Sequence, residues 1–412
     1  MTIHATVQRE QRSDFQGWAE KAEEVARELK RTAAARDLAG AAPHAEIDLL
    51  RLAGLLTIYI PKRFGGGGAT PAEVLRIVRI LARGDTSIAQ IVIYHLFGTA
   101  IGLDGDNKSL IERRLQGFLS KGWFHAGIAQ AAYEPLVEAR QVDGGFVLNG
   151  AKPFTSGAQV ADTLQVWVRF AGSTRIAGTD ASGHIGQFIV ANPTSGLSFG
   201  NDWDNIGQRL TVSGSAALEN VAASADDLVG HWPDDTVHPP HATLHVPIVH
   251  AAFGELYLGT ALAALEDARD YITQRGRPWL SSPAKKASED TLVVERFGRL
   301  SIALASAQAL ADAAGEAVQR AFERGRDLTA EERGHAAAIA YQSKVHSTEV
   351  ALEVTSRIFE LTGARSTARS FGFDRYWRNV RTHSLHDPVH YKVLEVGDFA
   401  LNGRVPPPTY YS

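Results

Sequence analysis

The hydrophobic periodicity of this chain changes twice, and these changes restrict its possible folds more than any other feature. Up to about Gly122 apolar residues recur every three or four positions, as over 15–29, which is typical of amphipathic helices. Apolar and polar residues then alternate in short runs such as 164–168, between Gly, Asn and Asp punctuation, as in strands. From Ile248 long alanine-rich helical patterns return, for example over 303–311. The chain is therefore expected to fold in three successive parts.

These parts predict an α+β fold that is mainly α. We expect an N-terminal helical domain over 1–121, a central antiparallel β-barrel over 122–235 and a C-terminal four-helix bundle over 236–412. The small residues of the third part would let its long helices approach closely.

Local signals locate several element ends. Pro71 suits the first position of a helix, and Asp85 suits the cap of the next one. The residues 58–60 predict a short extended segment, and Asp143-Gly144 predicts a hairpin turn. Pro388 predicts a helix end shortly before it and a new helix beyond.

Composition excludes several classes of function. The 412 residues contain no cysteine, which rules out disulfides, thiolate metal sites and cysteine nucleophiles. The net charge of −4 does not favour nucleic acid as a partner. No apolar run reaches the roughly 18 residues of a membrane span, and the N-terminal residues do not resemble a secretory signal. We therefore expect a cytoplasmic protein without a membrane partner, and no motif predicts a metal site.

The richest chemical segment is Trp377–Tyr391, near the C-terminus. It holds His383, His386, His390 and Asp387. Histidines at a helix end beside an acid can carry protons near neutral pH. A solvated polar helix end remains the alternative.

Five motifs carry a resemblance to a known family. They are Tyr94-His95-Leu96, Phe154–Ala158, Asn201-Asp202-Trp203, Arg277-Pro278-Trp279 and the long string Phe373–Pro388. With the order of the three parts, they resemble the acyl-CoA dehydrogenase superfamily, and most closely its reduced-flavin monooxygenase branch, typified by dibenzothiophene monooxygenase.

The resemblance implies a flavin site with three catalytic residues. Ser156 would bind flavin N5, while His95 and His386 would face each other across the flavin and handle protons at its peroxide adduct with O2. From the residues alone, a turn serine is the favoured interpretation of Ser156. Likewise, a histidine within an apolar helix, such as His95, is more often a hydrogen-bonded core residue.

Other residues would complete the flavin site. Trp203 would pack at the flavin edge, where barrel core is the alternative. Arg277 and Arg365 would serve the flavin phosphate of a neighbouring subunit, and both could instead be surface arginines.

Three residues would line the substrate cavity: Tyr94, Phe253 and Ile128. Phe253 could instead be a core residue of the bundle. Ile128 stands where the branch member that oxidises dibenzothiophene has an asparagine, and Gln130 follows it. That departure concerns the identity of the substrate.

The chain lacks both a GxGxxG motif after a strand and a phosphate-binding GKS/T loop. The resemblance therefore implies a two-component monooxygenase that receives reduced FMN from a separate flavin reductase, with FAD as the other flavin. It would be a homotetramer and would use O2 on an apolar heteroaromatic or organosulfur molecule. One alternative is an acyl-CoA dehydrogenase with bound FAD and Asp387 or His386 as the base. Another is a helical scaffold that has lost its flavin.

Overall fold

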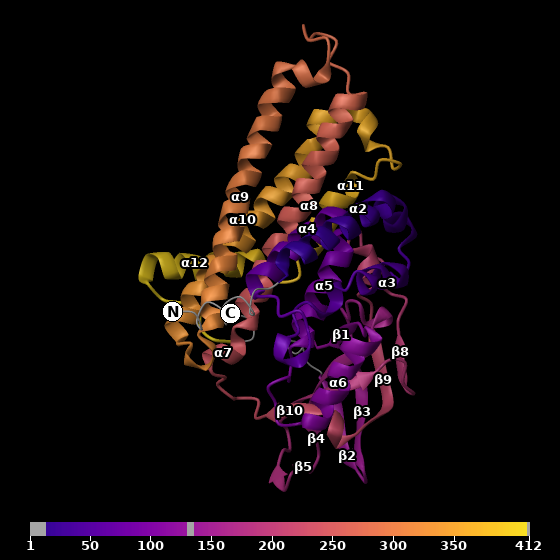
Figure 1. The fold of residues 1–412 in the computed structure, drawn as a ribbon, viewed down its shortest axis with the longest axis vertical. Helices are drawn as coiled ribbons and strands as arrows, with labels where there is room; N and C mark the ends of the chain where they lie inside the picture. Colours follow the sequence, from indigo (N-terminus) through magenta and orange to yellow (C-terminus); the bar gives the residue numbers. More distant parts are fainter. Residues whose placement is uncertain (1–13, 130–135, 410–412) are drawn as a thin grey trace, which may run out of the picture.

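Helices come first in the chain. The computed structural model describes residues 14–129 and 136–409. The N-terminal helices are α2 (Phe15–Ala39), α3 (His44–Leu52), α4 (Pro71–Gly84), α5 (Thr86–Thr99) and α6 (Lys108–Lys121). They form the indigo and violet part of the molecule in Figure 1.

The predicted starts of α4 and α5 are confirmed. Pro71 is the first residue of α4, behind a capping box between Thr70 and Glu73. Asp85 caps α5, since its carboxylate accepts hydrogen bonds from the amides of Ser87 and Ile88. The extended segment predicted at 58–60 is wrong, because these residues form turns after the 3₁₀ helix η1 (Leu55–Thr57).

The central region is a mixed sheet. Its strands are β1 (His125–Ile128), β2 (Val137–Val142), β3 (Gly145–Lys152), β4 (Thr163–Ala171), β7 (Ile185–Ala191), β8 (Leu197–Phe199), β9 (Ala216–Ala223) and β10 (Leu228–Trp232). A separate small hairpin joins β5 (Arg175–Ile176) and β6 (Thr179–Asp180). The predicted turn at Asp143-Gly144 connects β2 and β3.

An antiparallel barrel was the wrong expectation for this sheet. β1 and β2 both run parallel to β4, β1 beside its first half and β2 beside its second. Along the path β10-β7-β4-β2-β3-β9-β8 of the described strands, the two ends are not paired. Alternating residues reveal which face of a strand is buried, but they do not reveal its partner.

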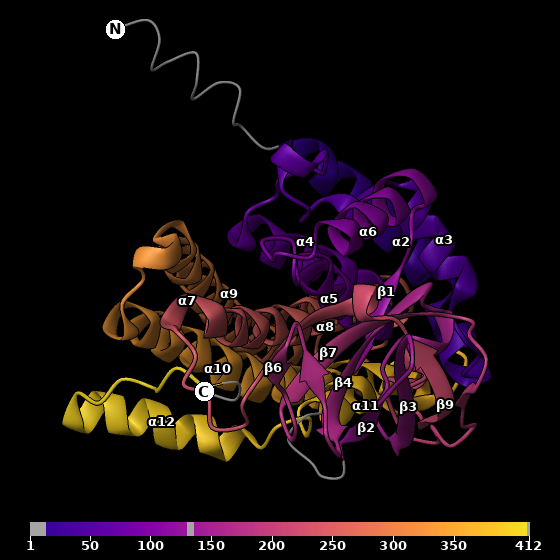
Figure 2. The same ribbon diagram turned by 90° about the horizontal axis from the view of Figure 1, so that it is seen from below.

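The described part of the C-terminal region contains three long α-helices and three shorter ones. After the short α7 (Pro240–Thr243) come α8 (His245–Arg275), α9 (Thr291–Glu323), α10 (Ala330–Thr362), α11 (Asp374–His383) and α12 (Val389–Asn402). The helical C-terminal region is confirmed, and so is the break predicted at Pro388, because α11 ends at His383 and α12 begins at Val389. α11 packs on α10 and α8, whereas α12 packs on α10 and projects beyond the outline of the bundle (Figures 1 and 2).

The most apolar helical stretch is Pro240–Arg275. By length and composition it could cross a membrane, but 89% of its most apolar window is buried inside the protein. It is therefore accounted for as the central helix of the bundle, against which α4, α9 and α10 pack.

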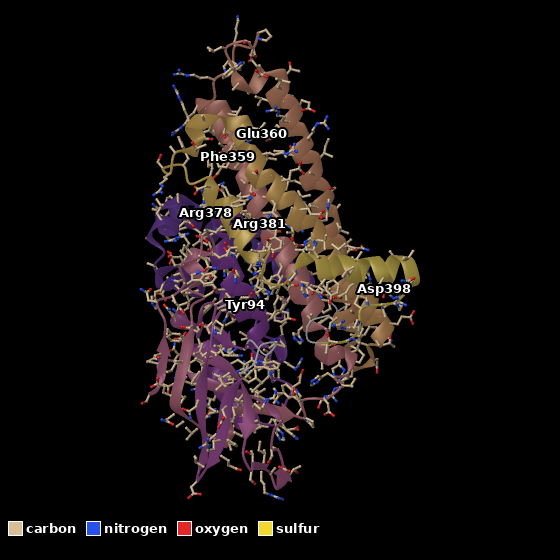
Figure 3. All side chains as sticks on the ribbon, turned by 180° about the vertical axis from the view of Figure 1, so that it is seen from behind. Tyr94, Phe359, Glu360, Arg378, Arg381 and Asp398 are labelled. Atoms are coloured by element: carbon tan, nitrogen blue, oxygen red, sulfur yellow. The ribbon has the colours of Figure 1, made fainter. Side chains whose placement is uncertain are left out.

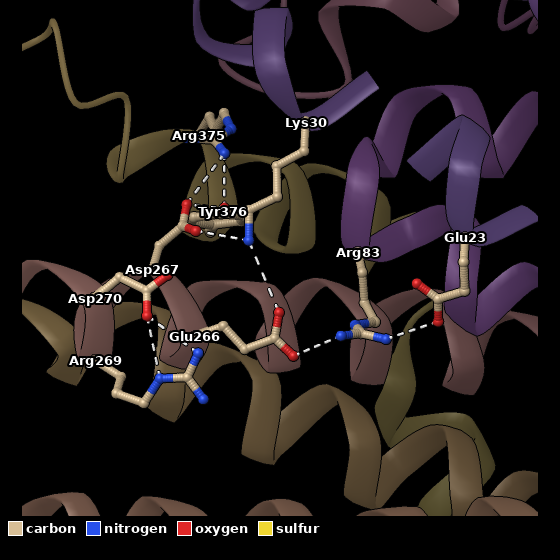
Figure 4. A network of polar contacts seen from close by, with 9 residues as sticks. All are labelled: Glu23, Lys30, Arg83, Glu266, Asp267, Arg269, Asp270, Arg375 and Tyr376. Atoms are coloured by element: carbon tan, nitrogen blue, oxygen red, sulfur yellow. Dashed lines mark hydrogen bonds and ion pairs between the residues drawn. The ribbon is translucent and has the colours of Figure 1, made fainter. Parts of the chain in front are cut away.

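A network of charged residues fixes α11 against the rest of the molecule (Figure 4). Asp267 of α8 accepts a hydrogen bond of 2.5 Å from the Tyr376 hydroxyl and pairs with Lys30 of α2 at 2.7 Å. The Arg375 guanidinium lies 3.6 Å from the same carboxylate. Since Arg375 and Tyr376 are buried, these contacts are less screened than surface ion pairs.

Candidate functional site

The motif Phe373–Pro388 has two parts. Residues 375–379 form an anchor that fixes α11 to its neighbours, and the histidines and Asp387 follow it. Besides Arg375 and Tyr376, Arg378 donates to the Ile206 carbonyl at 2.6 Å and pairs with Asp37 of α2. Asn379 accepts a hydrogen bond of 2.7 Å from the Gln208 amide. The anchor therefore joins α11 to both the N-terminal helices and the sheet region, and it holds the histidines beyond it in place.

Ser156 lies in the turn after β3, within a chain of polar side chains. Its hydroxyl is 2.6 Å from that of Ser213, and the Gln90 amide of α5 donates to it at 3.4 Å. Gln90 in turn accepts from the Gln208 side chain at 2.6 Å. Gln90, Gln208 and Ser213 are buried while Ser156 is half-buried, so Ser156 is the member of this chain that remains accessible.

Tyr94 links this polar chain to the bundle. It follows Gln90 by four residues, so both lie on one face of α5, and it lies where helices and sheet meet (Figure 3). Its ring packs edge-on against Phe253 of α8 at 6.3 Å between centroids. Phe253 in turn lies 5.3 Å from the ring of His386. Four predicted residues, Ser156, Tyr94, Phe253 and His386, are thus connected through successive contacts.

His383 joins this group, although no separate role was predicted for it. Its Nδ1 is 2.8 Å from the Tyr257 hydroxyl, and its ring stacks on His386 at 5.6 Å. Burial lowers the pKa of His383 well below its usual range, so the ring is neutral. Its Nε2 is buried without a hydrogen-bond partner among the described residues. Its position three residues before His386 was the available signal.

Asp387 is surrounded by three nitrogen-bearing side chains near the helical bundle. Its carboxylate lies 2.5 Å from Lys344 Nζ, 3.5 Å from His386 Nδ1 and 3.8 Å from His250 Nδ1. Burial alone would raise the pKa of Asp387, but the hydrogen bond from His386 and the charge of Lys344 outweigh burial and hold that pKa far below its ordinary value. Lys344 and His250 come from distant segments, and no sequence motif pointed to them.

His95 does not fit its predicted role at the flavin. Its ring is fully buried and stacks on Phe124. Nδ1 accepts a hydrogen bond of 2.9 Å from the His125 amide, and Nε2 lies 2.8 Å from the Leu56 carbonyl. Burial lowers the pKa of His95 to about 4. With both nitrogens committed to the backbone, His95 is the hydrogen-bonded core histidine of the alternative interpretation.

Trp203 lies beside the turn that holds Ser156. Its indole donates to the Gln208 carbonyl at 2.9 Å, and its ring packs edge-on against Phe154 at 6.3 Å. Phe154 is 60% exposed, and its φ is +58°, a conformation that costs energy for a bulky residue. Phe154, two residues before Ser156, and Trp203 thus present aromatic surface beside this turn.

Ile128 is a fully buried residue at the end of β1. Burial in the core is a sufficient reason for an apolar side chain at this position, so a contact with a ligand is not needed to explain it. Gln130 lies outside the described residues.

Arg277 and Arg365 lie in the segments that follow α8 and α10, at the end of the bundle away from the sheet (Figure 1). Both are exposed, and neither forms an ion pair or side-chain hydrogen bond with another described residue. The structure therefore does not bring them to Ser156 within one chain.

The residues around Ser156 suit a flavin ring system. The hydroxyls of Ser156 and Ser213 and the Gln90 amide can each donate or accept a hydrogen bond. The rings of Trp203 and Phe154 offer apolar faces next to them. Among residues 14–129 and 136–409 no cluster of three or more potential metal ligands occurs.

Comparison with known proteins identifies the family of the chain. The family descriptions "Acyl-CoA dehydrogenase, N-terminal domain" and "Acyl-CoA dehydrogenase, C-terminal domain" match residues 14–109 and 251–390.

Three relatives cover nearly the whole chain. Dibenzothiophene monooxygenase from Mycolicibacterium goodii is 36% identical over 94% of this chain and 95% of its own. The structure of methanesulfinate monooxygenase MsuC from Pseudomonas fluorescens matches with a TM-score of 0.88 and 35% identity, over 96% of this chain and 99% of that one. FMN-bound TdsC from Paenibacillus sp. A11-2 also matches with a TM-score of 0.88, at 34% identity over 96% of this chain and all of its own (100%). The chain therefore belongs to the acyl-CoA dehydrogenase superfamily, in the branch that contains dibenzothiophene monooxygenase.

Proposed function

We propose that this protein is an FMN-dependent monooxygenase that adds one atom of O2 to an organosulfur compound. The observation that carries the proposal is the continuous line Ser156–Gln90–Tyr94–Phe253–His386 in a chain of this family. It supports a site with hydrogen-bonding groups on the sheet side and a proton-carrying group on the bundle side.

Reduced FMN, when bound, supplies the electrons that activate O2. The hydroxyl of Ser156 hydrogen-bonds flavin N5, and Trp203 packs at the flavin edge. Tyr94 and Phe253 exclude water and shape the cavity for an apolar substrate. His386, the exposed histidine of the pair, moves the proton at the reacting oxygen, while neutral His383 supports its ring.

The groups that bind the flavin phosphate come from a neighbouring subunit. Four copies form a homotetramer in which Arg277 and Arg365 of one subunit bind the flavin phosphate of its neighbour. Their exposure and lack of ion pairs support this role, because a guanidinium without a carboxylate is free to bind a phosphate. A separate reductase delivers the reduced flavin in the cytoplasm.

The substrate class follows from the relatives, whose names cover a planar heteroaromatic and a small sulfinate. The apolar rings of Tyr94 and Phe253, which pack edge-on against each other, favour the heteroaromatic over the anion. FMN rather than FAD is favoured by the FMN-bound relative.

Acyl-CoA dehydrogenation fits this site less well. Asp387 is paired with Lys344, and its lowered pKa makes it a weak base. Removal of an α-proton needs a stronger one.

The test is turnover with chemically reduced FMN, O2 and either dibenzothiophene or methanesulfinate. We expect an oxygenated product from the heteroaromatic, and a loss of about a hundredfold or more in His386→Ala without a change in affinity for oxidised FMN. His390→Ala, a nearby exposed histidine, is the matched control. Unchanged turnover in His386→Ala would remove its assigned role, and reduction of bound flavin by acyl-CoA thioesters would favour the dehydrogenase instead.

A further inference from the structure

A buried lysine, Lys344, contacts the Asp387 carboxylate next to the proton-carrying His386. The Lys344 side chain on α10 is fully enclosed, and its ammonium lies 2.5 Å from Asp387 and 5.9 Å from the centre of the Phe253 ring. Burial of an unpaired ammonium is strongly unfavourable. Asp387 therefore serves as its counter-ion, and the chain retains a costly pair at this position.

The pair also restricts Asp387. One oxygen of the carboxylate, Oδ2, is bound by Lys344, so the other, Oδ1, faces Nδ1 of His386 at 3.5 Å. An imidazole that directs Nδ1–H toward a fixed carboxylate leaves Nε2 as its free atom. The arrangement resembles in its logic the acid that orients a catalytic histidine.

We propose that Lys344 is a positioning residue: by fixing the Asp387 carboxylate it makes His386 present Nε2 to the flavin and substrate. The role at the flavin rests on the proposed function, whereas the hold on His386 does not. His386 is 51% exposed and lies in the turn between α11 and α12, so without this contact its ring would sample several rotamers.

The other ionisable groups described near Lys344 and Asp387 are either paired with another residue or neutral. Lys392 of α12 is 2.9 Å from Glu395. Burial lowers the pKa of both His250 and His383 well below the usual range, so neither ring can replace the ammonium. Lys344 is thus the cation that compensates Asp387.

The experiment compares Lys344→Met with Lys344→Arg, Lys344→Met/Asp387→Asn and the matched control Lys392→Met, a second buried and paired lysine. The first readout needs no flavin: the rate of His386 acylation by diethylpyrocarbonate against pH, followed by mass spectrometry. In Lys344→Met the uncompensated carboxylate should keep His386 protonated to higher pH, which raises the midpoint by about one unit. Lys344→Arg should return it toward wild type, and Lys392→Met should leave it unchanged.

The second readout is coupling, the amount of product per reduced FMN consumed. We expect Lys344→Met to lower it about tenfold. The double variant should regain thermal stability, because no unpaired charge stays buried, but it should not regain coupling. Recovery of coupling together with stability would reduce Lys344 to a structural role, as would an unchanged midpoint in Lys344→Met. If the wild type oxygenates nothing, the proposed function fails, while the midpoint still decides whether Lys344 controls His386.

Discussion

At the scale of single residues, Ser156 has a hydroxyl that three partners can share. Ser213 and Gln90 already contact it, so a ligand atom would be a third partner in a preformed network. Such preformed donors lose little order when a ligand binds.

Ser156→Ala should raise the fraction of reduced FMN that is lost as hydrogen peroxide. A missing hydrogen bond of about 1 kcal/mol corresponds to roughly a fivefold change in that partition. The measurement is peroxide and product formed per flavin oxidised, with Ser182→Ala as a control in a distant turn. Equal coupling in both variants would make Ser156 a turn residue only.

His95 predicts a pH dependence of stability. Its folded pKa is about 4, below an unfolded value of about 6.5. The stabilisation from its neutral ring is therefore complete above about pH 6.5 and is lost as the pH falls toward 4, by up to about 3 kcal/mol. Urea unfolding of wild type and His95→Gln at pH 7 and 4.5 should show a smaller pH difference in the variant. An identical difference would mean that His95 does not resist protonation.

At the scale of elements, the sequence predicted helices well where side chains signal their ends. The starts of α4 and α5 were visible in Pro71 and Asp85. The orientation of residues on α5 was not, because that helix is buried on nearly every side. An apolar periodicity cannot then separate Tyr94, which faces Phe253, from His95, which faces the Phe124 side.

Contacts between distant segments were equally invisible. The parallel partners of β4 and the pairing of Lys344 with Asp387 depend on tertiary packing, for which neither spacing nor composition carries a signal. For Asp387 the motif string Phe373–Pro388 identified the segment, but for Lys344 no motif did.

The projecting helix α12 predicts an interface. It exposes Tyr391, Leu394 and Leu401, and Asp398 marks its position outside the body in Figure 3. Apolar surface of this kind is expected to be covered by a second copy. Leu394→Asp/Leu401→Asp should lower the mass measured by light scattering below that of the wild-type assembly. Leu52→Asp, an equally exposed position on α3, should not, and a monomeric wild type would refute the interface.

At the scale of the whole molecule, the site is divided between chains in our proposal. Ser156 belongs to the sheet side of one subunit, whereas Arg365 lies at the far bundle end and would serve its neighbour. Each subunit thus contributes to two sites.

Mixing subunits tests this division. Ser156→Ala and Arg365→Ala should each impair activity alone, but assemblies formed from equal amounts should have about a quarter of their sites intact. The measurement is the activity of the two variants after co-expression. The control is the activity after separately formed assemblies of each variant are mixed. No recovery would mean that both residues of a site come from the same subunit.

The apolar character of α8 also has a consequence for synthesis on the ribosome. The helix ends at Arg275, and its main packing partner α10 is complete only at Thr362. At about 5–20 residues per second, α8 waits several seconds for that partner. During that interval the nascent chain displays a segment that resembles a membrane span, so chaperone supply and growth temperature should govern the yield of this protein more than its final stability does.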